Sequence, residues 1–490
     1  MGVSSDTVSW RVERPSFVRI DATQEPMTIY TNSRPAQTVI IVGGGFSGLV
    51  CALQVRRLCP QTKVVVVERS LRRGPGLAYG EFAAGYVLNV PARRLDLGVS
   101  PSFQEWLDAN ASRYNLADAL VEAGGRMESV FAPRSAFGDY LEEIARRKDW
   151  SGDVEWIQAE AIGFLPAPRR GVVLTDGSQL EAAAVILATG NESPGPLGVA
   201  ALENSRGFIA NPWAAGALEG IARDEDVALV GTGLTAVDVV LALRRGGHEG
   251  RITAISRRGL LPRVHRLCPP AELFIETEAP GSPAKLIRSV RGAVQQKTAT
   301  GEPWQGVLDA IRPITQNIWQ RWSETEKRTF LRHARAWWDV HRHRMAPRVA
   351  KEMADARLQV LASRIEGAYA EHEATVLELV SRNRQKSLIR AVHVINCTGP
   401  TTDVAVRSTP IVADGLARGF LLRDPLGLGV ETNACAAMGA DGFASDWLFA
   451  IGPLTRPEFW EVTAVPEILA QGRALAERLS AADVTRGYGI

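Results

Sequence analysis

Residues Thr38–Leu58 read TVIIVGGGFSGLVCALQVRRL, and this stretch decides the fold. The β-branched run Val39–Val42 predicts a strand that is buried on both faces of a parallel sheet. Gly43, Gly45 and Gly48 have the spacing for a tight turn, a close backbone approach and close packing of helix against strand. The helix that follows would offer free N–H groups and a positive dipole end at its N-terminus. The stretch therefore predicts a strand–turn–helix unit that binds the pyrophosphate of a dinucleotide.

A second strand completes this unit. The sequence KVVVVE at 63–68 is another β-branched run, and it ends in Glu68. A carboxylate about twenty residues after the last glycine can accept hydrogen bonds from the hydroxyl groups of a ribose. A glycine motif alone is weak, but here it has the expected strand, helix and acidic residue around it, which favours nucleotide binding.

The same unit occurs a second time. Residues 226–247 read DVALVGTGLTAVDVVLALRRGG, and the strand-like RITAIS follows at 251–256. Gly231, Gly233 and Ala236 match the three glycines of the first copy at one constant offset. The chain therefore contains two dinucleotide-binding units, which predicts an α/β fold with two Rossmann-like domains.

The same offset identifies the residue of the second copy that corresponds to the acidic residue of the first. It places Ser256, followed by Arg257 and Arg258, where Glu68 stands in the first copy. A ribose 2′-phosphate would be repelled by a carboxylate and would be bound by hydroxyl and guanidinium groups. The second unit is therefore expected to prefer NADPH to NADH. The alternative is that the two arginines are a solvated strand end.

A similar five-residue run ends the group of predicted strands after each copy. The two runs are ILATG at 186–190 and INCTG at 395–399, and each ends in a glycine that allows a tight turn beside a nucleotide. The stretches 154–164 and 172–190 predict a β-meander that leads into the first run. The stretch 360–381 predicts another that leads into the second.

The composition is that of a globular enzyme with more than one domain. The chain has 490 residues, of which 46% are hydrophobic and 22% charged, and its formal net charge is +2. This balance gives no reason to expect a nucleic acid or an anionic membrane as the partner. The apolar run at 38–53 is too short and too rich in glycine for a membrane span, and the first residues are too charged for a signal peptide.

The five cysteines are scattered. Because Cys51, Cys59, Cys268, Cys397 and Cys435 form neither a CxxC pair nor a metal-ligand cluster, we expect reduced thiols in a cytoplasmic protein and no metal site. The same spacing argues against a dithiol–disulfide reductase.

A helical block is expected at about 283–352. An apolar stripe at 304–322 predicts a helix that kinks at Pro313. Ser323 and Glu326 then form a capping box, which marks the start of the next helix.

The second helix of the block predicts a face that changes from aromatic to basic. The positions on this face are Phe330, Leu331, Ala334, Trp337, Trp338, His341, Arg344, Met345 and Arg348, unless Pro347 ends the helix first. One interpretation is an anion-binding wall for a substrate carboxylate or a phosphate of NADPH. The other is a tryptophan core followed by solvated arginines at a helix end.

Several strings in the chain resemble a known family. In order they are GGGFSG, GPGLAYG, YVLNVPA, PRSAFGDYL, GTGLTAVDVV, ISRRGLLPRVH, WDVHRHRMAP and LFAIGPLTRPEFWEVTAVPEI, between about residues 38 and 470. The chain thereby resembles the bacterial FAD/NAD(P)-binding oxidoreductases of the YdhS-like type. These lie within the two-nucleotide flavoproteins related to class B and N-hydroxylating monooxygenases.

The resemblance implies where the flavin cofactor binds. It implies that Gly43, Gly45, Gly48 and Glu68 hold the ADP half of FAD, and that 76–92 runs close to the flavin. Gly452 and Pro453 stand where related flavoproteins carry a glycine–aspartate pair near the ribityl phosphate, so the aspartate is replaced here. The segment after Pro453 is expected to start a helix whose N-terminus stabilises negative charge on a reduced flavin.

The complete set of candidate site residues follows from these motifs. The cofactor-binding candidates are Gly43, Gly45, Phe46, Ser47, Gly48, Glu68, Arg69, Asn89, Val90, Thr189, Gly190, Gly231, Gly233, Leu234, Thr235, Ser256, Arg257, Arg258, Gly399, Gly452 and Pro453. The catalytic candidates are Arg344, His343 and Trp460, with His265 and His341 as further residues for the lining of the site.

These observations lead to an expected function. The leading hypothesis is a monooxygenase that uses FAD and NADPH, forms a flavin hydroperoxide and oxygenates a small molecule, with N-hydroxylation of an amine by analogy of fold. The alternatives are an NADPH-dependent reductase or dehydrogenase of a small organic acceptor and a nucleotide-binding regulatory protein without turnover. Molecular oxygen is a partner only in the first case, and a homodimer is compatible with the sequence.

The order of the motifs predicts discontinuous domains. After an N-terminal extension at 1–36, the FAD-binding domain is expected to use 37–215 and 400–490. The NADPH-binding domain is expected to use 216–262 and 356–399, with the helical insertion at 263–355 between them.

Overall fold

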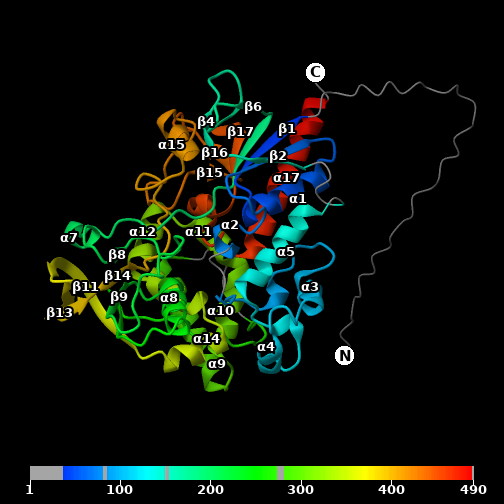
Figure 1. Cartoon of the computed structure of the whole chain (residues 1–490). Helices are drawn as coiled ribbons and strands as arrows, with labels where there is room; N and C mark the ends of the chain where they lie inside the picture. The colour runs from blue at the N-terminus through cyan, green and yellow to red at the C-terminus, as the bar shows by residue number, and fades with distance from the viewer. Residues whose placement is uncertain (1–36, 81–84, 148, 150–153, 273–280, 488–490) are drawn as a thin grey trace, which may run out of the picture. The chain divides into compact units, whose positions relative to one another are not determined.

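The computed structural model describes residues 37–80, 85–147, 149, 154–272 and 281–487 (Figure 1). The predicted N-terminal extension at 1–36 lies outside the described residues. Within them, none of the helices combines the length and the apolar character that crossing a membrane requires.

The first sheet is built around the strand of the quoted stretch, in the order β15-β16-β17-β7-β1-β2-β3. Its strands are β1 (Thr38–Val42), β2 (Lys63–Glu68), β3 (Val154–Gln158), β7 (Ala184–Leu187), β15 (Thr432–Asn433), β16 (Ala436–Met438) and β17 (Ala444–Ala450). The strands from β17 to β3 run parallel, and β16 and β15 are antiparallel. Loops that follow the parallel strands therefore meet at one edge of the sheet, where ligands of such folds bind.

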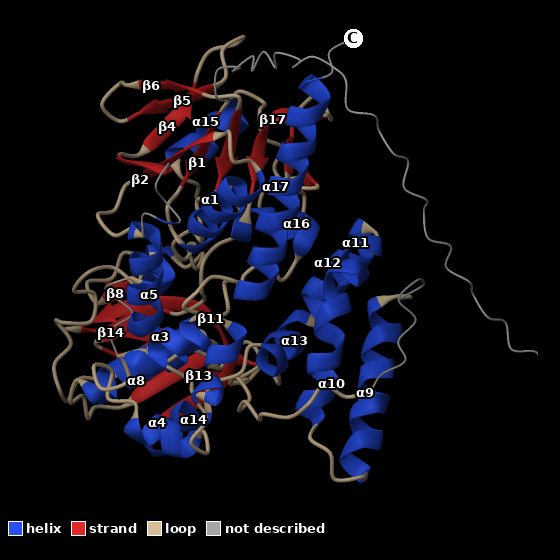
Figure 2. Cartoon of the chain, turned by 90° about the vertical axis from the view of Figure 1, so that its right-hand side faces the viewer, coloured by secondary structure: helices blue, strands red, loops and turns tan. Residues whose placement is uncertain are grey.

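Both faces of this sheet are covered, as the β-branched run predicts. Val39 and Ile41 pack in a core with α1 (Phe46–Leu58) and α17 (Val465–Gly487), which lie side by side (Figures 1 and 2). Ile40 and Val42 point to the other face and pack in a second core. That core includes residues of β4 (Ala161–Phe164), β5 (Gly171–Leu174), β6 (Gln179–Glu181) and α15 (Pro410–Ala417).

The expected meander at 154–190 is only partly correct. The strands β4, β5 and β6 form a separate antiparallel sheet, as a meander requires. However, β3 pairs in parallel with β2 and is the edge strand of the first sheet. The short strand has no alternating pattern that would separate these two arrangements.

A helical cap is inserted between β2 and β3. It contains α2 (Gly76–Tyr79), η2 (Ala92–Arg94), α3 (Phe103–Ala109), α4 (Ala117–Glu122), η3 (Met127–Ser129) and α5 (Arg134–Arg146). Its core joins Phe103, Phe137 and Tyr140 of the cap to Leu49 of α1. The cap is thereby packed against the helix that follows the first glycine turn.

The second sheet has the order β13-β12-β11-β10-β9-β14-β8. Its strands are β8 (Phe208–Ile209), β9 (Val227–Val230), β10 (Ile252–Ser256), β11 (Leu358–Glu371), β12 (Ala374–Ser381), β13 (Lys386–Ala391) and β14 (His393–Asn396). The start of β11 pairs in parallel with β10 and its remainder pairs antiparallel with β12. Because β8 belongs to this sheet, the second sheet begins before the domain boundary expected at residue 215.

The helical block consists of several short helices. They are α9 (Pro283–Ala299), α10 (Trp304–Ile311), η4 (Arg312–Ile314), α11 (Thr315–Arg321), α12 (Glu324–His333), α13 (Arg335–Arg342) and α14 (Pro347–Asp355). The kink predicted at Pro313 is confirmed as the 3-10 turn η4. The predicted capping box of Ser323 and Glu326 opens α12.

The single aromatic-to-basic face expected at 330–348 is wrong. Three helices share this segment, because α12 ends at His333, α13 ends at Arg342 and Pro347 is the first residue of α14. Trp337 is 48% exposed and Arg348 is exposed, whereas Arg344 is 3% exposed. The helix breaks thus separate residues that a continuous helix would align.

The block packs on the last segment of the chain through aromatic side chains. Trp319 stacks on Trp460 with ring centroids 4.6 Å apart, and its indole N–H donates to Pro457 O at 2.8 Å. Phe330 and Trp322 belong to the same core. Four further elements complete the described fold. One is the helix that follows β9 in the chain, α8 (Leu234–Arg245), and the other three are the short elements α7 (Ala200–Glu203), η5 (Gly452–Thr455) and α16 (Arg456–Phe459).

Candidate dinucleotide and substrate site

One cavity of about 760 Å³ lies at the carboxyl edge of the first sheet. Its wall begins at the glycine turn after β1, includes Glu68 after β2 and Thr189–Gly190 after β7, and continues to the N-terminus of α17. Residues of the helical block close the other end. Segments from widely separated parts of the sequence therefore form one site.

The first cradle, Gly43–Gly48, has a geometry that only small residues allow. Gly43 has a φ of +100°, and a Cβ there would lie 2.4 Å from Ala188 O. A Cβ on Gly48 would lie 1.9 Å from Gly43 O, because α1 packs directly against the turn. Gly45 approaches Gly76 closely, with 3.2 Å from an added Cβ to the Cα of Gly76. These contacts match the three roles expected from the sequence.

Glu68 is held in place beside this cradle. Gly44 N donates to its Oε2 at 2.6 Å and Ser70 N donates to its Oε1 at 2.8 Å. The carboxylate also lines the cavity. It is therefore oriented by the backbone at the position where a nucleotide ribose would bind.

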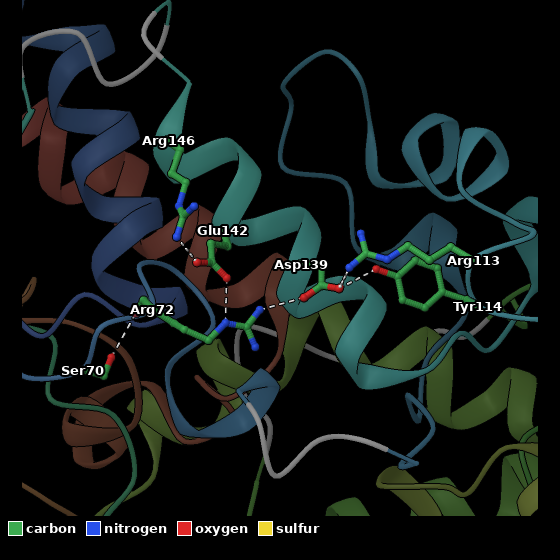
Figure 3. Close-up of polar contacts among 7 residues, drawn as sticks. All are labelled: Ser70, Arg72, Arg113, Tyr114, Asp139, Glu142 and Arg146. Atoms are coloured by element: carbon green, nitrogen blue, oxygen red, sulfur yellow. Dashed lines mark hydrogen bonds and ion pairs between the residues drawn. The ribbon is translucent and has the colours of Figure 1, made fainter.

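The loop after Glu68 is anchored by a polar network centred on Arg72 (Figure 3). Arg72 donates to Glu142 at 2.6 Å and to Asp139 at 2.7 Å, both on α5. Asp139 also accepts from Tyr114 at 2.6 Å and from Arg113 at 2.8 Å. Because Arg72 and Ser70 line the cavity, this network ties the part of the cavity next to Glu68 to the helical cap.

The far end of the cavity is formed by backbone and a helix terminus. Pro453 lines it, and Gly452 N donates to Gln471 Oε1 at 2.8 Å. The helix expected directly after Pro453 is shorter, since α16 ends at Phe459 and α17 begins at Val465. Thr463 and Val465, at the N-terminus of α17, also line the cavity. The positive end of the α17 dipole therefore faces this part of the site.

The second cradle, Gly231–Ala236, repeats the geometry of the first. Gly231 has a φ of +121°, and a Cβ there would lie 2.3 Å from Cys397 O. This contact is the counterpart of that between Gly43 and Ala188, so ILATG and INCTG have the same position relative to their cradles. No atom lies within 4 Å of a Cβ on Gly233, which leaves open space beside this turn.

The end of β10 differs from the end of β2. The hydroxyl of Ser256 lies 2.9 Å from that of Thr232 and accepts from Gly259 N at 3.0 Å. Arg257 is exposed. Arg258 is also exposed, but it donates to His333 O at 3.3 Å and lies over the ring of Trp337 at 5.9 Å. The Ser256 hydroxyl therefore orders the loop that follows β10. Of the two arginines, Arg258 contacts the helical block, whereas Arg257 is exposed.

The helical cap and the second nucleotide unit are joined by a partly buried ion pair. Arg134 of α5 lies 2.9 Å from the carboxylate of Asp238 on α8. Arg134 also lies over the ring of Tyr86, which contacts Trp213 edge to face. Arg134, Tyr86 and Trp213 all line the cavity, together with Thr235 at the start of α8.

A basic chamber closes the cavity at the helical block. We define it by the lining residues Arg94, His265, Asp309, Arg312, Arg342, His343 and Arg344. Arg312 makes a bidentate pair with Glu467, at 2.7 and 2.8 Å, and Arg342 donates to Glu461 at 2.9 Å. Burial raises the pKa of Glu467, but the hydrogen bond and charge of Arg312 lower it on balance. The block is thus attached to α17 and to the residues before it by charged pairs.

Arg344 has a different environment within this chamber. Its Nη2 donates to Asp309, but its Nε and Nη1 are buried without a hydrogen-bond partner in the described part of the chain. His265 Nδ1 is also buried without a partner. Burial, followed by the charge of Arg344, lowers the pKa of His265 to about 4, so its imidazole is neutral at pH 7.

The cavity brings together many, but not all, of the residues predicted from the sequence. It is lined by the predicted residues Gly43, Gly45, Phe46, Ser47, Glu68, Arg69, Asn89, Val90, Thr189, Gly190, Thr235, Pro453, His265, His343 and Arg344. Outside its lining are Gly48, Gly231, Gly233, Leu234, Ser256, Arg257, Arg258, Gly399, Gly452 and His341. Trp460 also lies outside it, because it is a core residue stacked on Trp319.

Sequence reasoning missed several lining residues. Arg94, Asp309 and Arg312 were not candidates, since none of them belongs to a quoted string, and Arg134 was not a candidate although it lies in the string PRSAFGDYL. The signals that were present are the position of Arg94 two residues after the string YVLNVPA, which was expected near the flavin, and the position of Arg134 within PRSAFGDYL.

Comparisons with known proteins agree with this geometry. Residues 40–192 match the model of a family described as FAD-NAD(P)-binding. No curated protein gives a match to the sequence. Among solved structures, ornithine N-hydroxylase of Kutzneria sp. 744 aligns with a TM-score of 0.61 and 15% identity, over 92% of this chain and 100% of that one. The chain has the fold of the N-hydroxylating monooxygenases.

Two further structures have this monooxygenase fold. Ornithine hydroxylase from Pseudomonas aeruginosa aligns with a TM-score of 0.58 and 15% identity, over 91% of this chain and 99% of that one. L-lysine 6-monooxygenase from Pseudomonas syringae aligns with a TM-score of 0.59 and 13% identity, over 92% and 100%. The similarity in fold thus extends over both sheets, whereas the family match ends at Glu192.

Proposed function

We propose that the chain is an FAD-dependent, NADPH-using monooxygenase of a small molecule, and that it N-hydroxylates an amine. The observation that carries the proposal is the single cavity. Its wall contains the first cradle, the start of α8 next to the second cradle, and the buried polar groups of the basic chamber. A hydride donor, a flavin and a small substrate would therefore share one site.

The residues of the first unit fit FAD. The first cradle leaves no space for a side chain at Gly43 or Gly48, and Glu68 is oriented beside it. Asn89, Val90 and Pro453 would line the flavin end, where the N-terminus of α17 would stabilise negative charge. Since Pro453 has no carboxylate, the ribityl chain would need another polar partner, and Ser47 of the first cradle lines the same cavity.

The chemistry that FAD would supply is hydride acceptance from NADPH and activation of oxygen. In the overall reaction, NADPH provides two electrons, and one oxygen atom of O₂ enters an N–H bond of the amine. The other atom leaves as water with the hydride and a proton from solvent. The part of this chain is to bind and orient the reactants and to exclude water from the chamber.

The cysteines support a route for electrons that uses no dithiol. All five are free, and none lines the cavity. Burial raises the pKa of Cys51 and of Cys397, so these thiols are unreactive. This leaves oxygen or a bound organic acceptor as the destination of the electrons.

Some finer assignments belong to the same proposal. We assign the FAD-binding domain to 37–215 and 400–490 apart from β8, and the NADPH-binding domain to 216–262 and 356–399. The eight strings of the sequence support kinship with the YdhS-like oxidoreductases, and the free thiols support a cytoplasmic location.

The test of the proposal is reduction followed by reoxidation. We expect purified protein reconstituted with FAD to be bleached by NADPH without oxygen, and more slowly by NADH. With oxygen and an amine panel that includes L-ornithine and L-lysine, consumption of O₂ and NADPH should match the hydroxylamine formed. Bleaching by NADPH without any oxygenated product from a broad panel would favour the reductase. Protein that does not bind FAD, or is not reduced, would contradict both enzymatic functions.

The preference for NADPH has its own test. Replacing Arg257 and Arg258 with alanine should raise the KM for NADPH about tenfold or more while changing the KM for NADH little, because only NADPH carries the 2′-phosphate. Arg257 alone should account for most of the effect, since Arg258 contacts the helical block. Equal effects on both cofactors would remove the assignment of the 2′-phosphate site.

A further inference from the structure

The basic chamber contains more positive than negative charge. Its guanidinium groups belong to Arg94, Arg312, Arg342 and Arg344, whereas the carboxylates that contact them belong to Asp309, Glu461 and Glu467. His265 adds no charge at neutral pH. The cluster therefore has one positive charge without a carboxylate partner, in a place where burial makes an uncompensated charge costly.

Arg94 is the guanidinium without such a partner. It is half-buried in η2 and lines the cavity, and it forms no salt bridge with the described residues. Burial, followed by the charges of Arg312 and Arg342, lowers the pKa of Arg94, although the carboxylate of Asp309 acts in the opposite direction. An anionic ligand bound in the chamber would relieve this repulsion between the guanidinium groups.

Arg344 is the second unsatisfied group. It is 3% exposed, so its two unpartnered N–H groups do not reach bulk water. Asp309 holds one end of the guanidinium, and the ring of Trp304 lies 5.8 Å from its centre. A buried arginine that is fixed on two sides and still has free donors is suited to bind an anion.

We propose that Arg344 and Arg94, with His265 in the same cavity lining, form a subsite that binds the carboxylate of the substrate. This rests on the proposed function, because it places an acidic group of the oxygenated molecule in the basic chamber. The pyrophosphate groups of both cofactors have other sites, at the cradles that begin α1 and α8. The inference therefore defines the substrate class as small carboxylic acids.

The substrate-class test uses pairs of probes that differ only in charge. Benzoate and glutarate are titrated into FAD-loaded protein by calorimetry, each against its amide. We expect the carboxylates to bind at least tenfold more tightly than the amides. Arg344→Gln and Arg94→Gln should each weaken the binding of the carboxylates at least tenfold and leave that of the amides unchanged.

Two variants make the test independent of folding. Arg348→Gln is the matched control, because Arg348 is an exposed arginine four residues further on that pairs with Glu352 at 3.3 Å. It should bind the carboxylates as the unaltered protein does. Arg344→Lys keeps the charge and should recover part of the affinity, with FAD content and melting temperature measured in every preparation.

The outcomes separate this inference from the proposed function. Equal binding of acids and amides, no binding of the acids, or the same loss in Arg348→Gln would overturn the subsite. A loss of NADPH affinity in Arg344→Gln without any change for the acids would overturn it as well, and would assign the chamber to the cofactor. Protein that binds acids through Arg344 but is never reduced by NADPH would instead contradict the monooxygenase.

Discussion

Gly48→Ala is expected to lose FAD. The added methyl group would lie 1.9 Å from Gly43 O, a backbone atom of the turn against which α1 packs, so the clash can be relieved only by moving α1 away from the turn. Overpacking of this kind costs about 1–3 kcal/mol and occasionally more. Because FAD would bind only the undistorted cradle, its affinity should fall roughly ten- to a hundredfold. The measurement is the FAD content of the purified protein and a titration with added FAD.

Gly233→Ala is the matched control for this prediction. Gly233 is in the second cradle, has no atom within 4 Å of the added carbon and has no strained φ. The variant should fold and retain FAD, and its KM for NADPH should rise because the methyl group occupies the space that a pyrophosphate would need. If Gly48→Ala binds FAD as tightly as Gly233→Ala does, the assignment of the first cradle to FAD is wrong.

Arg342→Met is expected to destabilise the protein strongly. Arg342 and Glu461 are 9% and 5% exposed, and the carboxylate would keep only the hydrogen bond from Trp338 Nε1. Removing one partner of a buried ion pair costs about 3–5 kcal/mol, because the remaining charge stays buried. Urea unfolding followed by tryptophan fluorescence should show this loss, and the helical block should be released first.

A double variant separates the charge from the packing. Arg342→Met with Glu461→Gln removes both charges and should recover a substantial part of the lost stability. Arg328→Met is the control, since Arg328 pairs with Glu324 on the surface of α12 and should change stability by less than about 1 kcal/mol. No recovery in the double variant would show that the uncompensated charge of Glu461 is not the cause of the lost stability.

Local patterns were sufficient for the two nucleotide units. The apolar runs before Gly43 and Gly231 predicted buried strands because each is followed by the glycine spacing of a turn against a helix. The capping box of Ser323 and the break at Pro313 depend on neighbours within a few residues, so they too were predictable. For the same reason, Glu68 could be placed at the end of β2 before any tertiary contact was known.

Other predictions failed where two environments suit the same local sequence. The strand β3 is short and half-buried, and its sequence does not decide between a meander and the edge of a parallel sheet. Trp460 and Arg344 were both candidates for the site, yet one is a core residue and the other lines the chamber.

The sequence by itself determined the two cradles, their order along the chain and the difference between Glu68 and Ser256, because these depend on residues within one strand–turn–helix unit. Only the tertiary structure decided that Arg94, from the cap, and Arg344, from the helical block, belong to one chamber. Their positions depend on how α17 and the residues before it pack against the block through Trp460, Glu461 and Glu467. Such long-range contacts have no periodicity along the chain, so no local pattern predicts them.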